Sequence, residues 1–254
     1  MDWIKAIGIA VGTYSVLPMP QYAWEGKSLR LAIFFLPLIG FIQGGALLCW
    51  QWITITLRIP AVLFGAVASV LPLLIAGGIH MDGYMDVCDA LASHQPRERK
   101  LEIMKDPHCG AFAVIRCAAY LLLSFGLYAA AFRTPVITAM SIGFILSRIL
   151  VVISALTLPN ARGGGMLFIF TENVSRRTPL AVLCVLCVCG IAAMVLFAGL
   201  AGVGGSLLAV SAFWYYRIMT RKQFGGATGD TSGYFLQLCE LLLLVGAYAG
   251  GLLT

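Results

Sequence analysis

Charged residues are scarce in this sequence, and acidic residues are scarcer still. Charged side chains make up 11% of the 254 residues, and only 11 residues are acidic. A soluble globular protein carries about 25% charged residues. The mean hydropathy is +0.93. This composition excludes an ordinary soluble domain and favours a protein that lies in a membrane.

The sequence also lacks the segments of about ten residues with alternating hydrophobicity that build a transmembrane β-barrel. It has instead apolar runs near the length of about 20 residues with which a helix crosses a bilayer. Only helices and closed barrels satisfy their backbone hydrogen bonds in lipid, so the runs predict an all-α polytopic integral membrane protein. We expect a single domain over residues 1–254 with about seven transmembrane helices, in a range of six to eight, at 31–54, 61–79, 111–131, 136–157, 180–200, 202–219 and 234–253.

The N-terminal segment has no A-x-A-like cleavage site of the kind that ends a signal peptide. Its apolar run stops early, at Pro18 and Pro20. We therefore expect a short re-entrant or interfacial helix that remains in the mature protein.

Cysteine and histidine offer little chemistry here. Cys184 and Cys187 have the spacing of a redox or metal pair, but they lie in an apolar run, where cysteine usually behaves as a small hydrophobic residue. The three histidines, His80, His94 and His108, follow one another at intervals of 14 residues, which does not suit the tight spacing of a zinc site. We expect ordinary loop or supporting roles for them.

The positive charge is distributed very unevenly, and the formal net charge is +6. With seven spans, the segments 1–30, 80–110, 158–179 and 220–233 share one side of the membrane. These segments and their flanks carry thirteen basic residues, namely Lys5, Lys27, Arg30, Arg97, Arg99, Lys100, Lys105, Arg162, Arg176, Arg177, Arg217, Arg221 and Lys222. The other side has Arg58 and Arg133, and Arg116 and Arg148 lie inside spans. Because Lys and Arg favour cytoplasmic loops, the first side is predicted to be cytoplasmic, with an odd number of spans.

Ten of the eleven acidic residues fall on the same side as the basic ones. The eleventh, Glu240, lies about two turns inside the last span, and an intramembrane carboxylate is a functional candidate by default. Acidic residues contribute little to membrane orientation, so their clustering needs another cause. We expect the active site to face the cytoplasm from a bacterial or archaeal inner membrane.

Three aspartates stand within eight positions, in the stretch HMDGYMDVCDA. Asp82, Asp86 and Asp89 have the spacing i, i+4, i+7, which places them in a sector roughly 60° wide on a helix. Like charges at this spacing destabilise a helix unless a cation lies among them. Carboxylate oxygens suit Mg²⁺, which typically takes one or two protein carboxylates together with substrate phosphate. The pattern predicts a magnesium site, although a solvated acidic loop is the plainer interpretation.

The next stretch, RERKLEIMKDPHCGAF, alternates charged and apolar residues, which is typical of a helix lying on the membrane surface. Glu102 and Asp106 repeat the i, i+4 carboxylate spacing, and Lys105 stands beside them. We expect these side chains to face the same site as the three aspartates.

The segment TRKQFGGATGDTSG combines fixed positive charge, glycines and one acid. Arg221 and Lys222 provide the charge, and Gly226 and Gly229 are among the glycines that let backbone amides approach a ligand. Asp230 comes just before the last span, where the amides of a helix N-terminus favour anions. The segment predicts a phosphate and metal pocket, although many glycine-rich turns only reverse the chain.

Arg162, followed by three glycines, admits two interpretations. Basic loops of this kind usually serve orientation and contact with lipid headgroups. The arginine is equally well suited to clamp a phosphate. With the carboxylates, these residues indicate a Mg²⁺-dependent phosphoryl transfer at the membrane surface, a reaction in which the metal and positioning supply most of the catalysis.

Three stretches, GGIHMDGYMDVCDA, RERKLEIMKDPHCGAFAV and TRKQFGGATGDTSGYFLQLCE, closely resemble the cobalamin synthase (adenosylcobinamide-GDP ribazoletransferase) family. The N-terminal LPMP and FFLPLIGFIQGG also resemble that family, so the resemblance covers nearly the whole chain in order. There are two departures: Ala90 follows the third aspartate where the family usually has Gly, and Ser15-Val16 replace a usual Thr-Arg pair. Neither departure removes a carboxylate.

The resemblance implies the late step of cobalamin biosynthesis that assembles the nucleotide loop. A ribose hydroxyl of α-ribazole, or of its 5′-phosphate, attacks the phosphate attached to cobinamide in adenosylcobinamide-GDP, and GMP leaves. Mg²⁺ is the implied cofactor, and the products are adenosylcobalamin, or its 5′-phosphate, and GMP. Besides these substrates we expect contact with the lipid bilayer and no nucleic-acid partner, and a homo-oligomer is compatible with the sequence.

On this interpretation the expected ligands of Mg²⁺ are Asp82, Asp86 and Asp89. Asp230 completes the metal site or acts as the base on the attacking hydroxyl, and Glu240 is the second candidate for the base. The side chains expected to bind the substrate phosphates are Lys105, Arg162, Arg221 and Lys222, with Gly226 and Gly229 contributing backbone amides.

Other membrane proteins use similar parts. A CDP-alcohol phosphotransferase would show D-x-x-D-G-x-x-A-R, but no Ala-Arg pair follows the Asp-Gly pair here. A polyprenyl transferase would have two Asp-rich motifs, whereas the second half of this chain offers only Asp230. A cation transporter, which belongs to a different class, would place acids along a path through the bilayer. These three remain the alternatives.

Overall fold

The computed structural model describes residues 2–20, 22, 26–132, 135–172 and 177–253. Arg133 and Arg176, which the charge count includes, lie outside these residues. The described part of the chain is built from helices and contains no β-strand; an isolated β-bridge joins Asn160 to Ala227. The predicted all-α class is confirmed.

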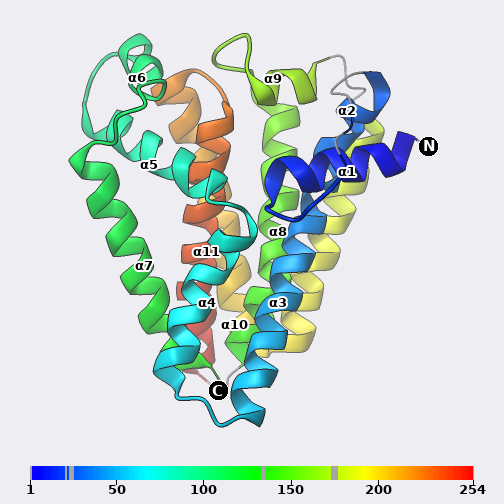
Figure 1. Cartoon of the computed structure of the whole chain (residues 1–254), viewed down its shortest axis with the longest axis vertical. Coiled ribbons are helices and arrows are strands. Elements are labelled where there is room, and N and C mark those ends of the chain that lie inside the picture. The colour runs from blue at the N-terminus through cyan, green and yellow to red at the C-terminus, as the bar shows by residue number, and fades with distance from the viewer. Residues whose placement is uncertain (1, 21, 23–25, 133–134, 173–176, 254) are drawn as a thin grey trace.

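The long helices run side by side along the vertical axis of Figure 1. They are α3 (Leu36–Thr56), α4 (Ala61–Ile75), α7 (Ala111–Ala131), α8 (Pro135–Thr157), α10 (Arg177–Phe224) and α11 (Gly229–Gly251). Within the described residues, five helical segments are long and apolar enough to cross a membrane, and a sixth is added if α4 and the bent helix after it count as one span.

Helix α10 is two antiparallel helices rather than one. Gly199 breaks it with backbone angles of φ 57° and ψ −132°. The Ser206 hydroxyl lies 3.7 Å from the Met194 sulfur, whereas residues twelve apart in a straight helix are separated by about 18 Å. The halves correspond to the predicted spans 180–200 and 202–219, which brings the count within the described residues to six, or to seven if α4 and the helix after it count as one span. The turn falls at Gly199, two residues before the break at position 201 that the predicted spans imply, because glycine adopts the positive φ that a sharp reversal needs.

The predicted span 61–79 ends earlier than expected. Helix α4 stops at Ile75, and helix α5 (Ile79–Ala92) continues at 94° to it. Gly77 and Gly78 form the corner with positive φ values of 64° and 79°. Helix α5 therefore lies across the end of the bundle and outside the spanning segments (Figure 1).

The N-terminal segment also lies across the bundle, as the sequence predicted for an interfacial helix. Figure 1 shows α1 (Asp2–Tyr14) crossing in front of the upright helices at the same end as α5. Helix α2 (Gly26–Ala32) and the short η1 (Ile33–Phe35) lead from it into α3.

Two further short helices complete this end of the molecule, α6 (Arg97–Ile103) and α9 (Met166–Thr171). The segments predicted to share one side of the membrane lie together here, and the C-terminal end lies at the other end of the bundle (Figure 1). Helix α8 forms the centre, since its side chains are buried from Val136 to Leu156 apart from a few positions. Helix α7 and the first half of α10 present apolar side chains such as Leu122 and Val188 outward.

Candidate active site

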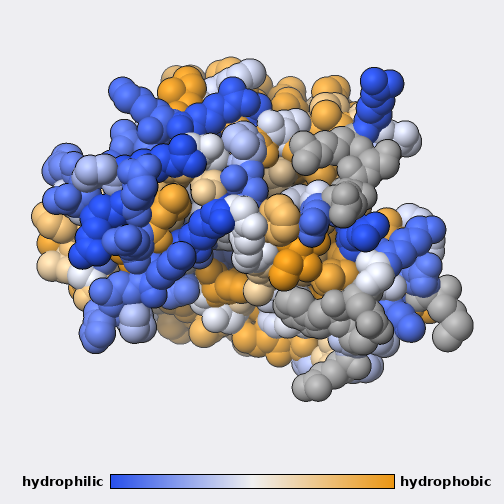
Figure 2. All heavy atoms as spheres, turned by 90° about the horizontal axis from the view of Figure 1, so that it is seen from above, coloured by the Kyte–Doolittle hydropathy of each residue, from blue (hydrophilic) through white to orange (hydrophobic). Residues whose placement is uncertain are grey.

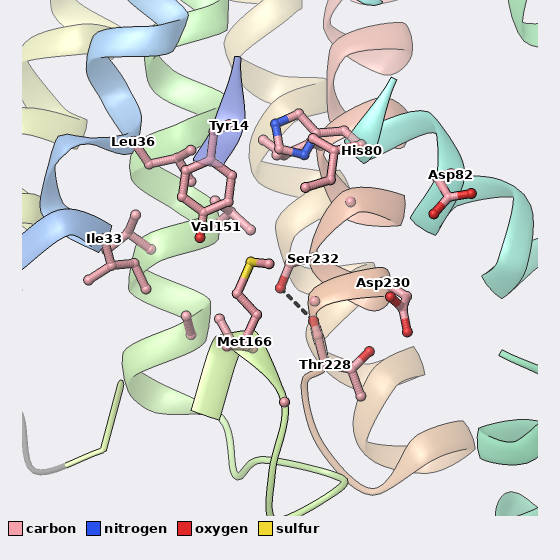
Figure 3. Close-up of a pocket in the computed structure, with 18 of the residues that line it drawn as sticks. Tyr14, Ile33, Leu36, His80, Asp82, Val151, Met166, Thr228, Asp230 and Ser232 are labelled. Carbon is pink, nitrogen blue, oxygen red and sulfur yellow. Dashed lines mark hydrogen bonds between the residues drawn. The ribbon is translucent and has the colours of Figure 1, made fainter. Parts of the chain in front are cut away.

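A cavity of about 270 Å³ opens at the end of the bundle where α5, α8, α11 and α1 meet. One wall is polar and includes Asp82, Arg162, Thr228 and Asp230. The opposite wall is apolar, with residues from η1, α3, α8 and α9, among them Ile33, Leu36, Val151 and Met166 (Figure 3). From outside, this end of the molecule shows its largest group of hydrophilic side chains on the left, further ones on the right, and apolar ones between them (Figure 2). We call this cavity the α5–α11 pocket.

Glycines allow α5 to approach the start of α11 closely. A Cβ on Gly83 would stand 2.8 Å from the Cα and the carbonyl oxygen of Asp230. A Cβ on Gly233 would stand 2.9 Å from the carbonyl oxygen of His80. Because both positions lack a side chain, the backbones meet directly, and Asp82 and Asp86 of α5 lie near Asp230. The predicted convergence of these two motifs is therefore built into the packing.

The carboxylates of this region lie near enough to repel one another. Asp82 lines the pocket, and Asp86 follows one turn later on the same face of α5. The pKa of Asp86 is raised to about 7, first by burial and then by the negative charges of Asp82 and Asp230. Asp86 therefore holds a proton at a pH where an ordinary aspartate is fully ionised.

Asp89, the third aspartate of the motif, caps the start of α7. Its Oδ2 accepts a hydrogen bond from the Gly110 amide at 2.7 Å, and its Oδ1 accepts one from the Ala113 amide at 2.8 Å. The side chain thus satisfies amides at the start of α7, which have no partner within their own helix. It does not line the α5–α11 pocket. Within the described residues, no group of three or more His, Cys, Asp or Glu is arranged to hold a metal ion.

Arg162 and Asp230, which are 68 positions apart in the sequence, form an ion pair at the pocket wall. The Arg162 Nη1 lies 2.9 Å from the Asp230 Oδ2, and both side chains remain partly exposed. The Asn160 side chain fixes the loop by accepting hydrogen bonds from the amides of Arg162 and Gly163. Of the two interpretations of Arg162, its place in the pocket favours the phosphate clamp.

A short backbone pairing holds this loop against the segment before α11. The Ala227 amide donates to Pro159 at 2.8 Å, and the Ala161 amide donates to Ala227 at 3.0 Å. Gly226 makes the pairing possible, because a Cβ there would collide with the carbonyl oxygen of Pro159. Gly226 therefore packs against the backbone at Pro159 and does not line the α5–α11 pocket.

The N-terminus of α11 points into the pocket. Thr228 caps the helix by accepting a hydrogen bond from the Thr231 amide at 3.1 Å, and the Thr231 hydroxyl accepts one from the Thr228 amide at 2.8 Å. Gly229 lines the pocket and has open space where a Cβ would stand. The free amides of a first helical turn are a ready site for an anion.

Sequence reasoning missed Tyr14 and underrated His80. Their rings stack with centroids 6.1 Å apart, and both line the pocket (Figure 3). His80 is 5% exposed, and its Nε2 has no hydrogen-bond partner. Burial lowers the pKa of His80 to about 3, so the imidazole is neutral. Only its place in the aspartate motif singled out His80, and no local signal marked Tyr14.

The other predicted phosphate ligands lie outside the pocket lining. Lys105, Arg221 and Lys222 are exposed at the surface of the same end of the bundle. Glu102 and Asp106 do not face the aspartates of α5: Glu102 pairs with Arg99 at 2.7 Å, and Asp106 pairs with His108 at 2.6 Å, all on exposed side chains.

Glu240 lies in the core of the bundle. Its carboxylate forms an ion pair with Arg148 of α8, and both side chains are at most 3% exposed. Glu240 borders a separate small cavity together with Tyr120 and Tyr128. The structure therefore gives this carboxylate a partner away from the pocket.

Comparison with known proteins places these features in context. The family model described as "Cobalamin-5-phosphate synthase" matches residues 6–248. An adenosylcobinamide-GDP ribazoletransferase of Lachnoclostridium phytofermentans is 38% identical and covers 95% of this chain and 92% of its own. A protein of the same name from Desulfitobacterium hafniense is 34% identical, with 98% of each chain covered. No solved structure matches the chain.

Proposed function

The chain belongs to the cobalamin-5-phosphate synthase family, and on that premise we propose that the α5–α11 pocket is its active site. The enzyme transfers the adenosylcobinamide phosphate group from adenosylcobinamide-GDP to α-ribazole or its 5′-phosphate, and GMP leaves. This is the step of cobalamin biosynthesis that assembles the nucleotide loop. The observation that carries the assignment is the meeting of Asp82, Arg162, Asp230 and the N-terminus of α11 at one pocket wall.

The donor atoms at this wall fit Mg²⁺. Asp82 and Asp230 line the pocket and Asp86 follows one turn later on α5, and all three offer hard carboxylate oxygens. The pKa of Asp86 is raised by burial and then by the negative charges of Asp82 and Asp230, which a bound cation would offset. Mg²⁺ usually takes one or two protein carboxylates and completes its shell with water and substrate phosphate, so a preformed cage is not required. When bound, the metal neutralises the diphosphate and polarises its oxygens. We assign Asp82 and Asp86 as its ligands and keep Asp89 as the cap of α7.

The remaining groups bind and orient the diphosphate. In the free enzyme Arg162 pairs with Asp230. A phosphate that binds to the amides of α11 replaces Asp230 as the partner of the Arg162 guanidinium, because arginine binds phosphate through paired hydrogen bonds. Asp230 is then free to accept the proton of the attacking hydroxyl. The hydroxyl oxygen forms the new bond to the phosphorus next to cobinamide, the bond to the bridging oxygen breaks, and GMP leaves with that electron pair.

The apolar wall suits the flat base of α-ribazole. At about 270 Å³ the pocket holds part of the reacting pair only, because complete ligand sites usually span about 300–1,000 Å³. We propose that the base packs on Tyr14 and the residues of η1 and α8, while the corrinoid remains outside the pocket. The enrichment of Lys and Arg at this end of the bundle supports a cytoplasmic orientation in the inner membrane.

A Gly83→Ala substitution tests whether the close approach of α5 to α11 matters for catalysis. Alanine in a helix is normally about 1 kcal/mol better than glycine. Here its Cβ would stand 2.8 Å from the Asp230 backbone, which forces the two helices apart. We expect turnover to fall about 100-fold, the effect of a misplacement near 1 Å. The measurement is GMP release by the purified variant in nanodiscs.

Gly45→Ala is the matched control, because a Cβ on that helical glycine meets nothing within 4 Å. It should keep wild-type turnover. Wild-type turnover in the Gly83→Ala protein would contradict the proposed active site.

The raised pKa of Asp86 predicts that Mg²⁺ binding depends on pH. Below about pH 7 a proton occupies the carboxyl group and competes with the metal, so the affinity for Mg²⁺ falls as the pH falls. Between pH 8 and pH 6 we expect an affinity loss of about tenfold, which one proton with a pKa near 7 produces. Titration calorimetry at both pH values measures it, and Asp86→Asn should flatten the dependence. Equal affinities in the wild type at pH 6 and pH 8 would remove Asp86 from the metal site.

A further inference from the structure

A second cavity, of about 290 Å³, lies away from the active site between α7 and α10. Its lining includes Arg116 of α7, Tyr215 of α10 and Tyr234 of α11, and α5 contributes Cys88, Leu91 and Ala92. On helix α5 these three residues point away from the face that carries Asp82 and Asp86. We call this cavity the α7–α10 pocket.

The α7–α10 pocket lies near the ends of α7 and α11. Arg116 and Tyr234 each lie five residues inside their helices, which is about 8 Å below the helix ends. The surrounding surface is apolar and exposed: Phe112 is 56%, Ile115 61% and Trp214 59% exposed. Such side chains on a membrane protein face acyl chains, so the pocket is accessible from the bilayer.

The positive charge of Arg116 lacks a counter-charge. Within the described residues, Arg116 forms neither an ion pair nor a side-chain hydrogen bond. The other arginine inside a span, Arg148, is paired with Glu240. No acidic residue lines the α7–α10 pocket, and His94 is its other basic group. An arginine near the end of a spanning helix reaches toward the lipid headgroups, where anionic lipids attract it.

We propose that the α7–α10 pocket binds the phosphate of an anionic phospholipid. The guanidinium of Arg116 matches phosphate oxygens in a paired geometry. Tyr215 and Tyr234 line the same pocket and supply hydroxyls that can donate to the headgroup, and the acyl chains run along the apolar surface of α7 and α10. Because the lining has positive and no negative side chains, a headgroup with net negative charge is preferred over a zwitterionic one.

The bound lipid would brace the helix that carries the catalytic aspartates. Helix α5 contributes Cys88, Leu91 and Ala92 to the α7–α10 pocket. On another face of the same helix, Asp89 caps the start of α7. A headgroup held between α5 and α7 adds a further connection between these two helices. This links the membrane to the position of α5 without a contact in the active site.

Native mass spectrometry of the full-length protein tests the proposal. Protein released from nanodiscs with equal amounts of phosphatidylglycerol and phosphatidylcholine should retain phosphatidylglycerol preferentially. Arg116→Gln should lower that retention about tenfold, and Arg116→Lys should keep most of it. Arg116 is exposed, so the glutamine leaves no buried group unsatisfied. Arg30→Gln is the control, because Arg30 is exposed on α2 at the same end of the bundle and lines no described pocket.

Four outcomes would overturn the proposal. Equal retention in the wild type and in Arg116→Gln would remove Arg116 as the ligand, and an equal loss in Arg30→Gln would show unspecific attraction. Displacement of the retained lipid by millimolar inorganic phosphate would show that the pocket takes soluble phosphate, since acyl-chain contacts should hold the lipid. Equal retention of the two lipids by the wild type would remove the preference for negative charge.

Discussion

An Asp86→Ala variant should turn over adenosylcobinamide-GDP about 1,000-fold more slowly than the wild type while remaining folded in the membrane. Asp86 lies one turn from Asp82 on the face of α5 beside Asp230. Its loss removes one of the two carboxylates proposed to hold Mg²⁺ against the diphosphate. Asp82→Ala should show a loss of similar size. GMP release in nanodiscs is the measurement.

The melting temperature of Asp86→Ala shows whether turnover is lost because a proposed metal ligand is missing or because the protein is unfolded. The folded-state pKa of this acid is raised to about 7, so above that pH its ionised form opposes folding in the metal-free protein. At pH 8 alanine should leave the melting temperature unchanged or raise it. Asp106→Ala is the control, because Asp106 is exposed and pairs only with His108. Wild-type turnover in Asp86→Ala would remove the metal assignment.

Removing Glu240 should destabilise the protein by about 3–5 kcal/mol, because it leaves the Arg148 charge buried without a partner. Both side chains are at most 3% exposed, in the packed centre of the bundle. The double variant Arg148→Met/Glu240→Leu removes both charges and should recover most of the lost stability. Thermal unfolding of the single and double variants in one detergent measures the two effects.

The same pair of variants decides whether Glu240 is the catalytic base. Glu240 borders a cavity separate from the α5–α11 pocket. We therefore expect the double variant to keep turnover within about tenfold of the wild type, since its active site is untouched. A stable but inactive double variant would show that Glu240 takes part in the reaction and that Asp230 does not suffice as the base.

Local sequence patterns predicted the parts of this protein that depend on local physics. Runs of apolar residues located the spans, because crossing a bilayer requires a fixed helix length. The spacing of Asp82 and Asp86 predicted a common helix face, and both residues lie on α5. Gly77 and Gly78 form the corner after α4, and the predicted span extends four residues beyond the end of that helix.

Contacts between distant segments were not predictable in this way. Asp89 shares the helix face of its neighbours, yet it bonds the amide of Gly110, which precedes α7 and lies 21 positions later. Glu240 and Arg148 are 92 positions apart, and the sequence around each residue does not indicate that they pair. Tyr14 reaches the pocket only because α1 lies across the bundle. Each of these residues acquires its role from tertiary packing, which periodicity does not encode.

The most direct measurement follows GMP and cobalamin together in purified protein supplied with adenosylcobinamide-GDP, α-ribazole and Mg²⁺. We expect the two products to form in equal amounts, to stop on addition of EDTA and to resume when Mg²⁺ is restored. The Asp82→Ala and Asp86→Ala proteins should form neither product at a comparable rate. Turnover that continues in EDTA, or that survives both substitutions, would contradict a magnesium site on α5 as the centre of the reaction.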